Sequence, residues 1–267
     1  MSTTRIEWAD KTWNPVTGCT KCSAGCLHCY AEPMAQRLCA MGLPKYRKAF
    51  ELALHADCLN EPLAWKKGRN VFVCSMSDLF HESVPFDYID RVLDVIAATP
   101  QHRYQILTKR AERLHAYSAR RDVPGNAWLG VTVESKSSRA RIDYLRRIPA
   151  SVHFLSCEPL LEDLGILDLR GIDWVIVGGE SGHQARPMKE EWVLRIRAQA
   201  MAQGCAFFFK QWGTWGRDGV KRSKRANGKI LAGQVVQEMP NRRSCPGAGK
   251  GSSNNGEQDG EESERES

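Results

Sequence analysis

Short apolar runs recur along the first 240 residues, about 20 to 35 residues apart, with polar segments between them. Each run is rich in β-branched or aromatic residues, as is typical of a strand buried on both faces. The runs are "NVFVCSMSD", "RYQILTKR", "AWLGVTVES", "VHFLSCEP", "DWVIVGGES" and "CAFFFKQWG". They predict six buried strands, and a further strand is predicted near residues 12–17.

Amphipathic patterns lie between the apolar runs. The segment "PFDYIDRVLDVIAATP" places its apolar side chains on one helical stripe: Phe86, Ile89, Val92, Leu93 and Ile96. The segments "SSRARIDYLRRIP" and "KEEWVLRIRAQAMAQG" repeat this pattern, and Gly204 is placed to cap the second of them. Helices are therefore predicted to follow the strands.

A repeated order of strand and helix is typical of parallel β/α units. About seven units at a steady spacing favour a full or partial parallel β/α barrel over a doubly wound open sheet. No glycine-rich dinucleotide fingerprint follows the first strand, which also disfavours the open sheet. The predicted fold class is α/β, with a TIM-like barrel domain over residues 1–240 and a disordered acidic tail over residues 241–267.

Composition limits the class of protein. The chain has 267 residues, of which 42% are hydrophobic and 26% are charged, enough for one large or two small domains. It contains no apolar run of about 18 residues and no apolar core of a secretory signal, so we expect no membrane span and a cytoplasmic location. In a reducing compartment, four bunched cysteines indicate metal binding, whereas scattered cysteines indicate core packing.

The net charge of +7 is unevenly distributed. Residues 247–267 carry six acidic and two basic side chains, so the remaining chain is more basic than the whole. Such a surplus favours nucleic acid or a phosphorylated substrate as the partner. The alternative is that these lysines and arginines only solvate helix faces.

Polar residues follow nearly every predicted strand. Because active sites of β/α barrels lie at the carboxyl ends of the strands, this rim is the predicted active site. For a single rim residue, a solvated loop position or a tight turn is the favoured explanation, but the regular placement of these residues favours function. The set comprises Ser75, Ser77, Asp78, Thr108, Lys109, Arg110, Glu134, Ser135, Cys157, Glu158, Gly178, Gly179, Glu180, Ser181, Lys210 and Gln211.

Four cysteines fall in the loop after the first strand, at the same rim: Cys19, Cys22, Cys26 and Cys29. The last three have the spacing C-x3-C-x2-C, which can bind three irons of a [4Fe-4S] cluster and leave the fourth iron open. All four cysteines together could instead enclose a tetrahedral zinc ion. Spacing alone leaves both sites open.

Several runs in one order resemble a phage- and bacterium-associated three-cysteine-motif family of the radical S-adenosylmethionine superfamily. They include "TWNPVTGC", "GCLHCYAE", "VFVCSMSDLFHE", "WLGVTVES", "FLSCEPLL" and "IDWVIVGGESG", within residues 12–240. The resemblance implies a [4Fe-4S] cluster that binds S-adenosyl-L-methionine and generates a 5'-deoxyadenosyl radical. In the family pattern an apolar residue commonly stands at the position of Cys22, so the third cluster ligand is either Cys19 or Cys22.

The resemblance also implies roles for the rim residues. Polar groups after the second strand would hold the amino group of the cofactor: Ser75, Ser77 and Asp78. Glu134 and Ser135 would hold its ribose hydroxyls. The substrate would face Lys109, Glu158 and Lys210, the predicted catalytic residues, together with Arg110 and Arg186. His81 is expected to pack rather than to bind a ligand.

The basic residues and the aromatic residues indicate which class of substrate to expect. The basic body, with Trp212 and Trp215 near one end, favours a nucleic acid or nucleotide as the substrate, and a reductant protein would supply electrons. Two alternatives remain open. One is a zinc-bearing nucleic-acid-binding module without catalysis, and the other is a radical enzyme that acts on a partner protein encoded nearby.

Overall fold

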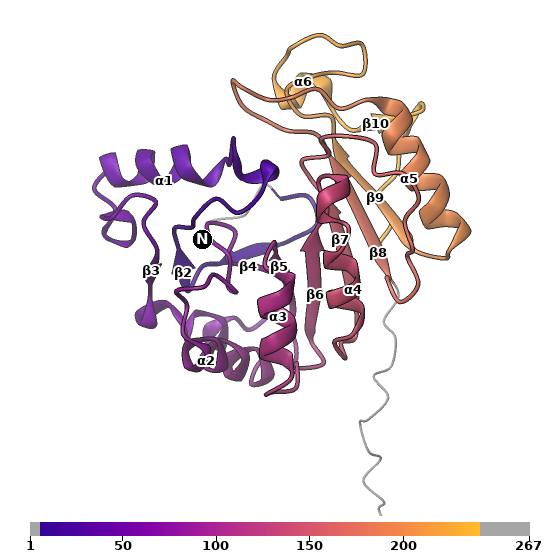
Figure 1. The fold of residues 1–267 in the computed structure, drawn as a ribbon. Coiled ribbons are helices and arrows are strands. Elements are labelled where there is room, and N and C mark those ends of the chain that lie inside the picture. Colours follow the sequence, from indigo (N-terminus) through magenta and orange to yellow (C-terminus); the bar gives the residue numbers. More distant parts are fainter. Residues whose placement is uncertain (1–5, 241–267) are drawn as a thin grey trace, which may run out of the picture.

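The computed structural model describes residues 6–240; the predicted tail over residues 241–267 lies outside them. Seven parallel strands form one sheet that curls into part of a barrel (Figure 1). The first and last strands are its edges, so the prediction of a parallel β/α barrel is confirmed in its partial form. In sheet order the strands are β1 (Lys11–Trp13), β4 (Asn70–Val73), β5 (Arg103–Thr108), β6 (Ala127–Thr132), β7 (His153–Cys157), β8 (Trp174–Gly178) and β9 (Ala206–Gln211).

Helices cover the outer face of the sheet (Figure 1). They are α2 (Phe86–Ala97), α3 (Ala111–Ser118), α4 (Arg141–Arg146) and α5 (Glu190–Ala202). Gly204 has φ of +72°, which confirms the predicted cap of α5. Among residues 6–240, no helix is long and apolar enough to cross a membrane.

Shorter elements complete the fold. The remaining helices are α1 (Ala31–Ala40) and α6 (Lys224–Asn227). Two small antiparallel pairs form from β2 (Val16–Thr17) with β3 (Ala53–Leu54) and from β10 (Ile230–Leu231) with β11 (Gln234–Val235). Single 3-10 turns are η1 (Ala24–Cys26), η2 (Pro44–Tyr46), η3 (Ala56–Cys58), η4 (Glu61–Ala64) and η5 (Lys136–Ser138).

The two faces of the sheet have different cores. The outer face packs mainly aliphatic residues against the helices, with rings such as Tyr104, Phe207 and Phe209 among them, whereas large aromatic rings dominate the inner face. Gly130 makes room for this cluster, because a Cβ there would lie 2.3 Å from the ring of Phe154. The cluster fills the inside of the curled sheet with Trp8, Phe72, Trp128, Phe154, Trp174 and Phe208. The aromatic cluster therefore fills most of the inside of the sheet, and the charged residues of the predicted rim lie at the carboxyl ends of the strands.

The first predicted strand, over residues 12–17, is wrong as a single element. Only β1 joins the large sheet, and β2 pairs with β3 instead. The chain leaves the sheet at Asn14, whose Oδ1 accepts hydrogen bonds from the Ser75 hydroxyl and the Met76 amide at 3.1 and 3.3 Å. Pro15 follows and has no amide N–H to continue a ladder.

Candidate active site

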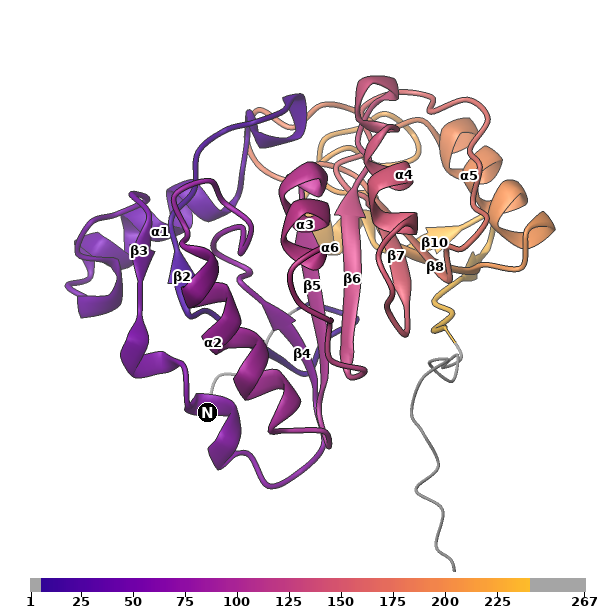
Figure 2. The same ribbon diagram turned by 60° about the horizontal axis from the view of Figure 1, so that its bottom comes forward.

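We call residues 18–30 the cysteine loop. It crosses the carboxyl ends of the strands, as the indigo segment at the top of Figure 2 shows. It starts at Gly18, where φ is +78° and a Cβ would lie 2.0 Å from the carbonyl oxygen of Glu51, so only glycine fits. The Ser77 hydroxyl donates to the Gly18 carbonyl at 2.5 Å. The start of the loop is therefore fixed beside the end of β4.

One anchor of the loop is an ion pair between Asp78, which follows β4, and Arg110, which follows β5. We call it the Asp78–Arg110 clasp. The buried Asp78 carboxylate accepts hydrogen bonds from the Phe80 and Lys109 amides, the Thr108 hydroxyl and the Arg110 guanidinium. Arg110 also donates to the Thr20 carbonyl at 3.1 Å and to the Cys19 sulfur at 3.6 Å. This clasp therefore ties Cys19 and Thr20 to the sheet.

His81 strengthens the same anchor. The Ser83 amide donates to Nδ1 of His81 at 3.1 Å, so Nε2 carries the proton and donates to the Thr20 hydroxyl at 2.8 Å. Burial and the charge of Arg110 lower the pKa of His81, which keeps the ring neutral. His81 packs against the loop, as expected from the sequence.

The second anchor is the Glu180–Arg186 clasp, which follows β8. Arg186 donates to both oxygens of the buried Glu180 carboxylate, at 2.8 and 2.6 Å, and to the Ala24 carbonyl at 3.0 Å. Nδ1 of His28 lies 3.4 Å from the same carboxylate. Burial raises the pKa of Glu180, but the hydrogen bonds and charge of Arg186 outweigh it and hold that pKa below its usual value.

The middle of the loop rests on Glu134, after β6. A Cβ at Gly25 would lie 3.1 Å from Cγ of Glu134, so glycine allows this close packing. Arg141 donates to Oε2 of Glu134 at 2.7 Å, whereas the buried Oε1 has no hydrogen-bond partner among the described residues. Burial raises the pKa of Glu134, but the Ser23 hydroxyl and the charge of Arg141 outweigh it and hold that pKa below its usual value, so the group stays charged.

The cysteines differ in environment. The sulfurs of Cys22 and Cys26 lie 4.0 Å apart, and a hydrogen bond from Cys22 is the main cause that lowers the pKa of Cys26 to about 4. Burial raises the pKa of Cys19 to about 11. Cys22 is exposed. Cys29 is half-buried and packs against a small core that includes Ala31 and Ala35 of α1. Within residues 6–240, no three acidic, histidine or cysteine side chains converge closely enough to enclose a metal ion.

The far side of the rim holds a second polar group. The Lys210 ammonium lies 2.8 Å from Oε2 of Glu158, and the Gln211 amide donates to Oε1 at 3.1 Å. Gly178 lets Glu158 lie over β8, because a Cβ there would lie 3.1 Å from its carboxyl carbon. The predicted catalytic residues Glu158 and Lys210 are therefore in contact, and both are partly exposed.

The predicted cofactor-binding side chains already have protein partners. The Ser75 hydroxyl donates to Asn14, Ser77 to Gly18, and Ser135 caps the turn η5. Together with Asp78 they hold the loops of the rim in place. The structure brings these residues to one rim, and their roles toward a cofactor remain predictions.

The prediction of two stacking tryptophans is wrong for Trp212. Its ring is 2% exposed, packs edge-on against Phe209, and donates its N–H to the Ile230 carbonyl at 2.9 Å. Trp215 is half-buried and lies under the Lys221 ammonium, 5.0 Å from the ring centre. Only Trp215 is available to a ligand.

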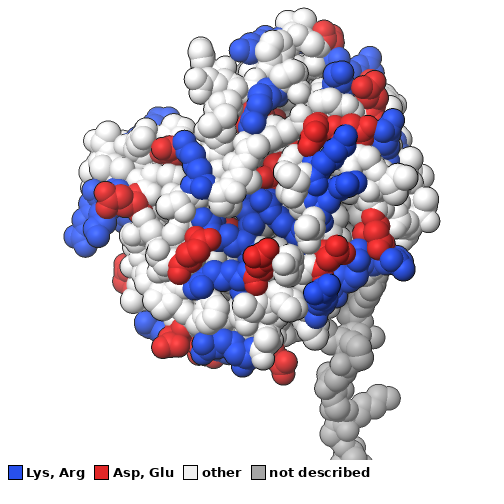
Figure 3. All heavy atoms as spheres, viewed as in Figure 1, with Lys and Arg blue, Asp and Glu red and all other residues white. Residues whose placement is uncertain are grey.

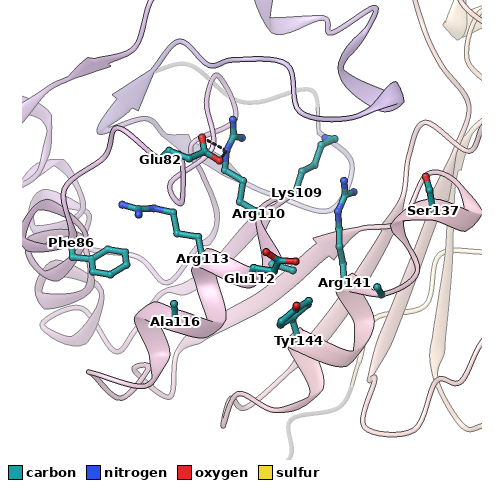
Figure 4. A pocket seen from close by; sticks show the side chains of 12 residues that line it. Glu82, Phe86, Lys109, Arg110, Glu112, Arg113, Ala116, Ser137, Arg141 and Tyr144 are labelled. Carbon is teal, nitrogen blue, oxygen red and sulfur yellow. Dashed lines mark hydrogen bonds and ion pairs between the residues drawn. The ribbon is translucent and has the colours of Figure 1, made fainter.

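A groove of about 660 Å³ opens between α3 and α4, beside the rim (Figure 4). Lys and Arg side chains gather over the centre of this face (Figure 3). Its charged lining is Glu82, Lys109, Arg110, Glu112, Arg113 and Arg141. Arg110 pairs with Glu82 and Arg141 with Glu134, so much of the positive charge in the groove is neutralised. Lys109 lowers the pKa of the nearby Cys26, which places its charge next to the cysteine loop.

Sequence reasoning missed three residues of the site: Thr20, Gly25 and Arg141. Thr20 and Gly25 lie inside the cysteine motif, where only the cysteines stand out. Arg141 is one of four arginines in "RARIDYLRR", and nothing in that pattern marks the one that reaches Glu134.

Comparisons with known proteins place the chain in a family. A family model described as "Protein of unknown function (DUF5131)" matches residues 3–240. A search of curated proteins found no match.

Solved structures of similar shape are spore photoproduct lyases. A mutant of that enzyme has a TM-score of 0.45 and 13% identity, over 67% of this chain and 58% of its own. The enzyme complexed with dinucleoside spore photoproduct has a TM-score of 0.44 and 11% identity, over 74% of this chain and 62% of its own. The chain thus spans about three-fifths of the length of these structures.

Proposed function

The chain belongs to the DUF5131 family of proteins of unknown function, and we propose that this chain is a radical S-adenosylmethionine enzyme. One observation carries the proposal. A loop with four thiols is held across the carboxyl ends of a partial β/α barrel by two arginine–carboxylate clasps. In a barrel this is where the chemistry lies.

The donor set fits a [4Fe-4S] cluster with an open iron. Thiolates are the ligands that such clusters use, and three of them leave one iron free. Cys26, whose pKa is lowered to about 4, and Cys29 would be two ligands, with Cys22 or Cys19 as the third. When bound, the reduced cluster supplies the electron that splits S-adenosyl-L-methionine into methionine and a 5'-deoxyadenosyl radical.

Other rim residues would bind the cofactor and the substrate. The spare acceptor oxygen of Glu134 suits a ribose hydroxyl, with Ser135 nearby. Ser75, Ser77 and Asp78 would serve the cofactor's amino group by exchanging present partners. Lys109, Glu158 and Lys210 would orient the substrate or move a proton. We propose a nucleic acid or nucleotide as that substrate; a partner protein is the alternative.

Anaerobic reconstitution with iron and sulfide tests this function. We expect a brown protein that, once reduced, cleaves S-adenosyl-L-methionine slowly to 5'-deoxyadenosine. Cys26→Ser and Cys29→Ser should lose the iron, whereas Cys39→Ser, which changes a half-buried cysteine of α1, should keep it. Stoichiometric zinc with no iron after reconstitution would refute the proposal.

One observation favours a second function, a zinc-bearing nucleic-acid-binding module. The distance of 4.0 Å between the sulfurs of Cys22 and Cys26 is close to the edge of a tetrahedral zinc site, about 3.8 Å for a Zn–S bond of about 2.3 Å. In that case all four cysteines bind the metal. Either Cys19→Ser or Cys22→Ser would then weaken zinc binding, and no 5'-deoxyadenosine would form.

A further inference from the structure

The most basic stretch of the described chain lies after β9, and of its residues only Trp215 has been discussed above. We call residues 213–229 the basic loop. It contains one acidic residue, Asp218, and six cations: Arg217, Lys221, Arg222, Lys224, Arg225 and Lys229. A cluster of this density on one surface segment is an electrostatic footprint for a polyanion.

The basic loop is built onto the rim. At Gly213, with φ of +84°, a Cβ would lie 2.2 Å from the carbonyl oxygen of Glu180. At Gly179 a Cβ would lie 1.9 Å from the carbonyl oxygen of Trp212. The two backbones therefore touch, and glycine is required on both sides. Since Arg186 links Glu180 to the cysteine loop, the basic loop starts next to the mouth of the barrel.

The basic loop is also held in one conformation. The Trp215 N–H donates to the Ala185 carbonyl at 2.6 Å. The Asn227 side chain donates to the carbonyls of Gly213 and Thr214 at 3.0 and 2.9 Å, which closes the loop. A surface fixed in this way loses little conformational entropy when it binds a ligand.

Much of the positive charge in the basic loop is not neutralised. Arg222 pairs with Asp218 at 2.6 Å. Arg217 and Lys224 reach carboxylates only at 3.7 and 3.9 Å, on exposed side chains. Among the described residues, no carboxylate pairs with three of the six cations, Lys221, Arg225 and Lys229. In the groove between α3 and α4, two of the four cations, Arg110 and Arg141, form close pairs at 2.8 and 2.7 Å, whereas Arg222 alone of the six cations in the basic loop is held so closely.

We propose that the basic loop binds the phosphate backbone of a single-stranded nucleic acid and leads it to the mouth of the barrel. Phosphates would contact Lys221 and Arg225, and a base would stack on Trp215, beside the Lys221 ammonium. Cations next to an aromatic face are the usual pairing at sites for single strands. Any reaction of a base at the mouth of the barrel depends on the proposed function. Binding of the strand to the basic loop does not depend on it.

A membrane surface fits the basic loop less well. A helix that lies in a membrane interface needs a broad apolar face, and α6 has only four residues. Val220 is the one large apolar side chain of the loop that is strongly exposed, at 47%. Polar recognition of phosphates is therefore favoured over insertion into lipid.

The test uses the full chain and a labelled single-stranded 20-mer, with anisotropy measured between 50 and 200 mM salt. The variant Lys221→Gln with Arg225→Gln should bind at least 10-fold more weakly at 50 mM. The slope of log affinity against log salt should fall by about 1.4, since each phosphate contact contributes about 0.7.

The matched control is Lys66→Gln with Lys67→Gln. It removes the same charge from two exposed residues before β4, at the opposite end of the barrel. We expect this control to bind within about 2-fold of wild type. Because every residue changed carries an exposed or half-exposed side chain, the melting temperatures should match, which separates binding from folding.

Three outcomes would overturn the inference: equal loss in the two variants, full competition by 1 mM mononucleotide, or tighter binding to vesicles with 30% phosphatidylserine than to the oligonucleotide. Failure of the proposed function gives a different pattern. Loop-dependent binding without iron refutes only the radical chemistry, whereas formation of 5'-deoxyadenosine without loop-dependent binding refutes only the present inference.

Discussion

The two clasps of the cysteine loop do the same task in different surroundings. In the Asp78–Arg110 clasp the side chains are 8% and 6% exposed, and Asp78 accepts four hydrogen bonds. In the Glu180–Arg186 clasp the carboxylate is 4% exposed but the arginine is 29% exposed. The start of the loop, at Thr20, is therefore fixed inside the protein, whereas its middle, at Ala24, is fixed nearer the surface.

This difference shows what the loop needs. Both arginines donate to loop carbonyls, one at Thr20 and one at Ala24. Cys22 lies between these two points and is exposed. The clasps therefore fix the backbone on either side of Cys22 and leave its side chain at the surface, where its sulfur reaches Cys26. Cys19, by contrast, is held by Arg110 itself.

The largest effect should come from replacing Cys19 or Cys22. Arg110 of the buried clasp contacts Cys19, whereas Cys22 lies between the two clasps. We expect Cys22→Ser to abolish the cluster and Cys19→Ser to leave it. Cys22 is exposed and lies between the two anchored points of the loop, whereas the Cys19 sulfur accepts a hydrogen bond from Arg110 and burial raises its pKa to about 11. Iron and sulfide content of the two anaerobically reconstituted variants measures this. Iron retained by Cys22→Ser and lost by Cys19→Ser would make Cys19 the third ligand.

The next largest effect should come from breaking the buried clasp. Arg110→Met leaves the Asp78 carboxylate buried without its counterion, which costs about 3 to 5 kcal/mol of unfolding free energy. Urea unfolding at pH 7 measures it. Glu82→Gln is the control, because Glu82 pairs with the same arginine but is 63% exposed, and it should cost less than about 1 kcal/mol. Similar losses of unfolding free energy in Arg110→Met and Glu82→Gln would show that the buried pair is no more important than the exposed one.

The fold was largely predictable, because burial on both faces leaves a clear mark in the sequence. Each of the six long apolar runs became a parallel strand. The exception was the first strand, where Asn14 and Pro15 redirect the chain through contacts with residues about 60 positions away. Contacts so distant in sequence leave no local periodicity to detect.

The sequence predicted which polar residues lie at the rim, but it did not predict which of them form hydrogen bonds and ion pairs with one another. Polar residues after each strand identified Asp78, Glu134, Glu158 and Glu180. The structure brings Asp78, Glu134 and Glu180 against the cysteine loop, and Glu158 lies on the far side of the same rim. Their partners could not be assigned, because which arginine reaches which carboxylate depends on side-chain geometry. The burial of Trp212 was missed for the same reason, since it depends on packing against the chain that follows it.

The exposed clasp should contribute less to stability. Arg186→Gln removes hydrogen bonds to a charged group, which are worth about 1.5 to 3 kcal/mol, but water can reach the gap that it leaves. We therefore expect a smaller loss than for Arg110→Met in the same urea assay. The control is Arg195→Gln, which breaks an exposed pair with Asp163 and should cost less than about 1 kcal/mol. An Arg186→Gln loss as large as that of Arg110→Met would mean that the two clasps are equivalent.

The smallest effect is the pH dependence of that loss. The pKa of Glu180 is held below its ordinary value of 4.5, so the clasp stabilises the protein fully above that pH. Its contribution is lost as the pH falls from 4.5 through the lowered pKa of the folded state, because protonated Glu180 no longer attracts Arg186. His28 faces the same carboxylate, so both proteins should carry His28→Asn to remove this second partner of Glu180. Urea unfolding at pH 7, 5 and 4 should show the loss from Arg186→Gln unchanged between pH 7 and 5 and reduced at pH 4. A constant loss at all three values would mean that Arg186 acts through its contact with the Ala24 carbonyl rather than through its charge pair.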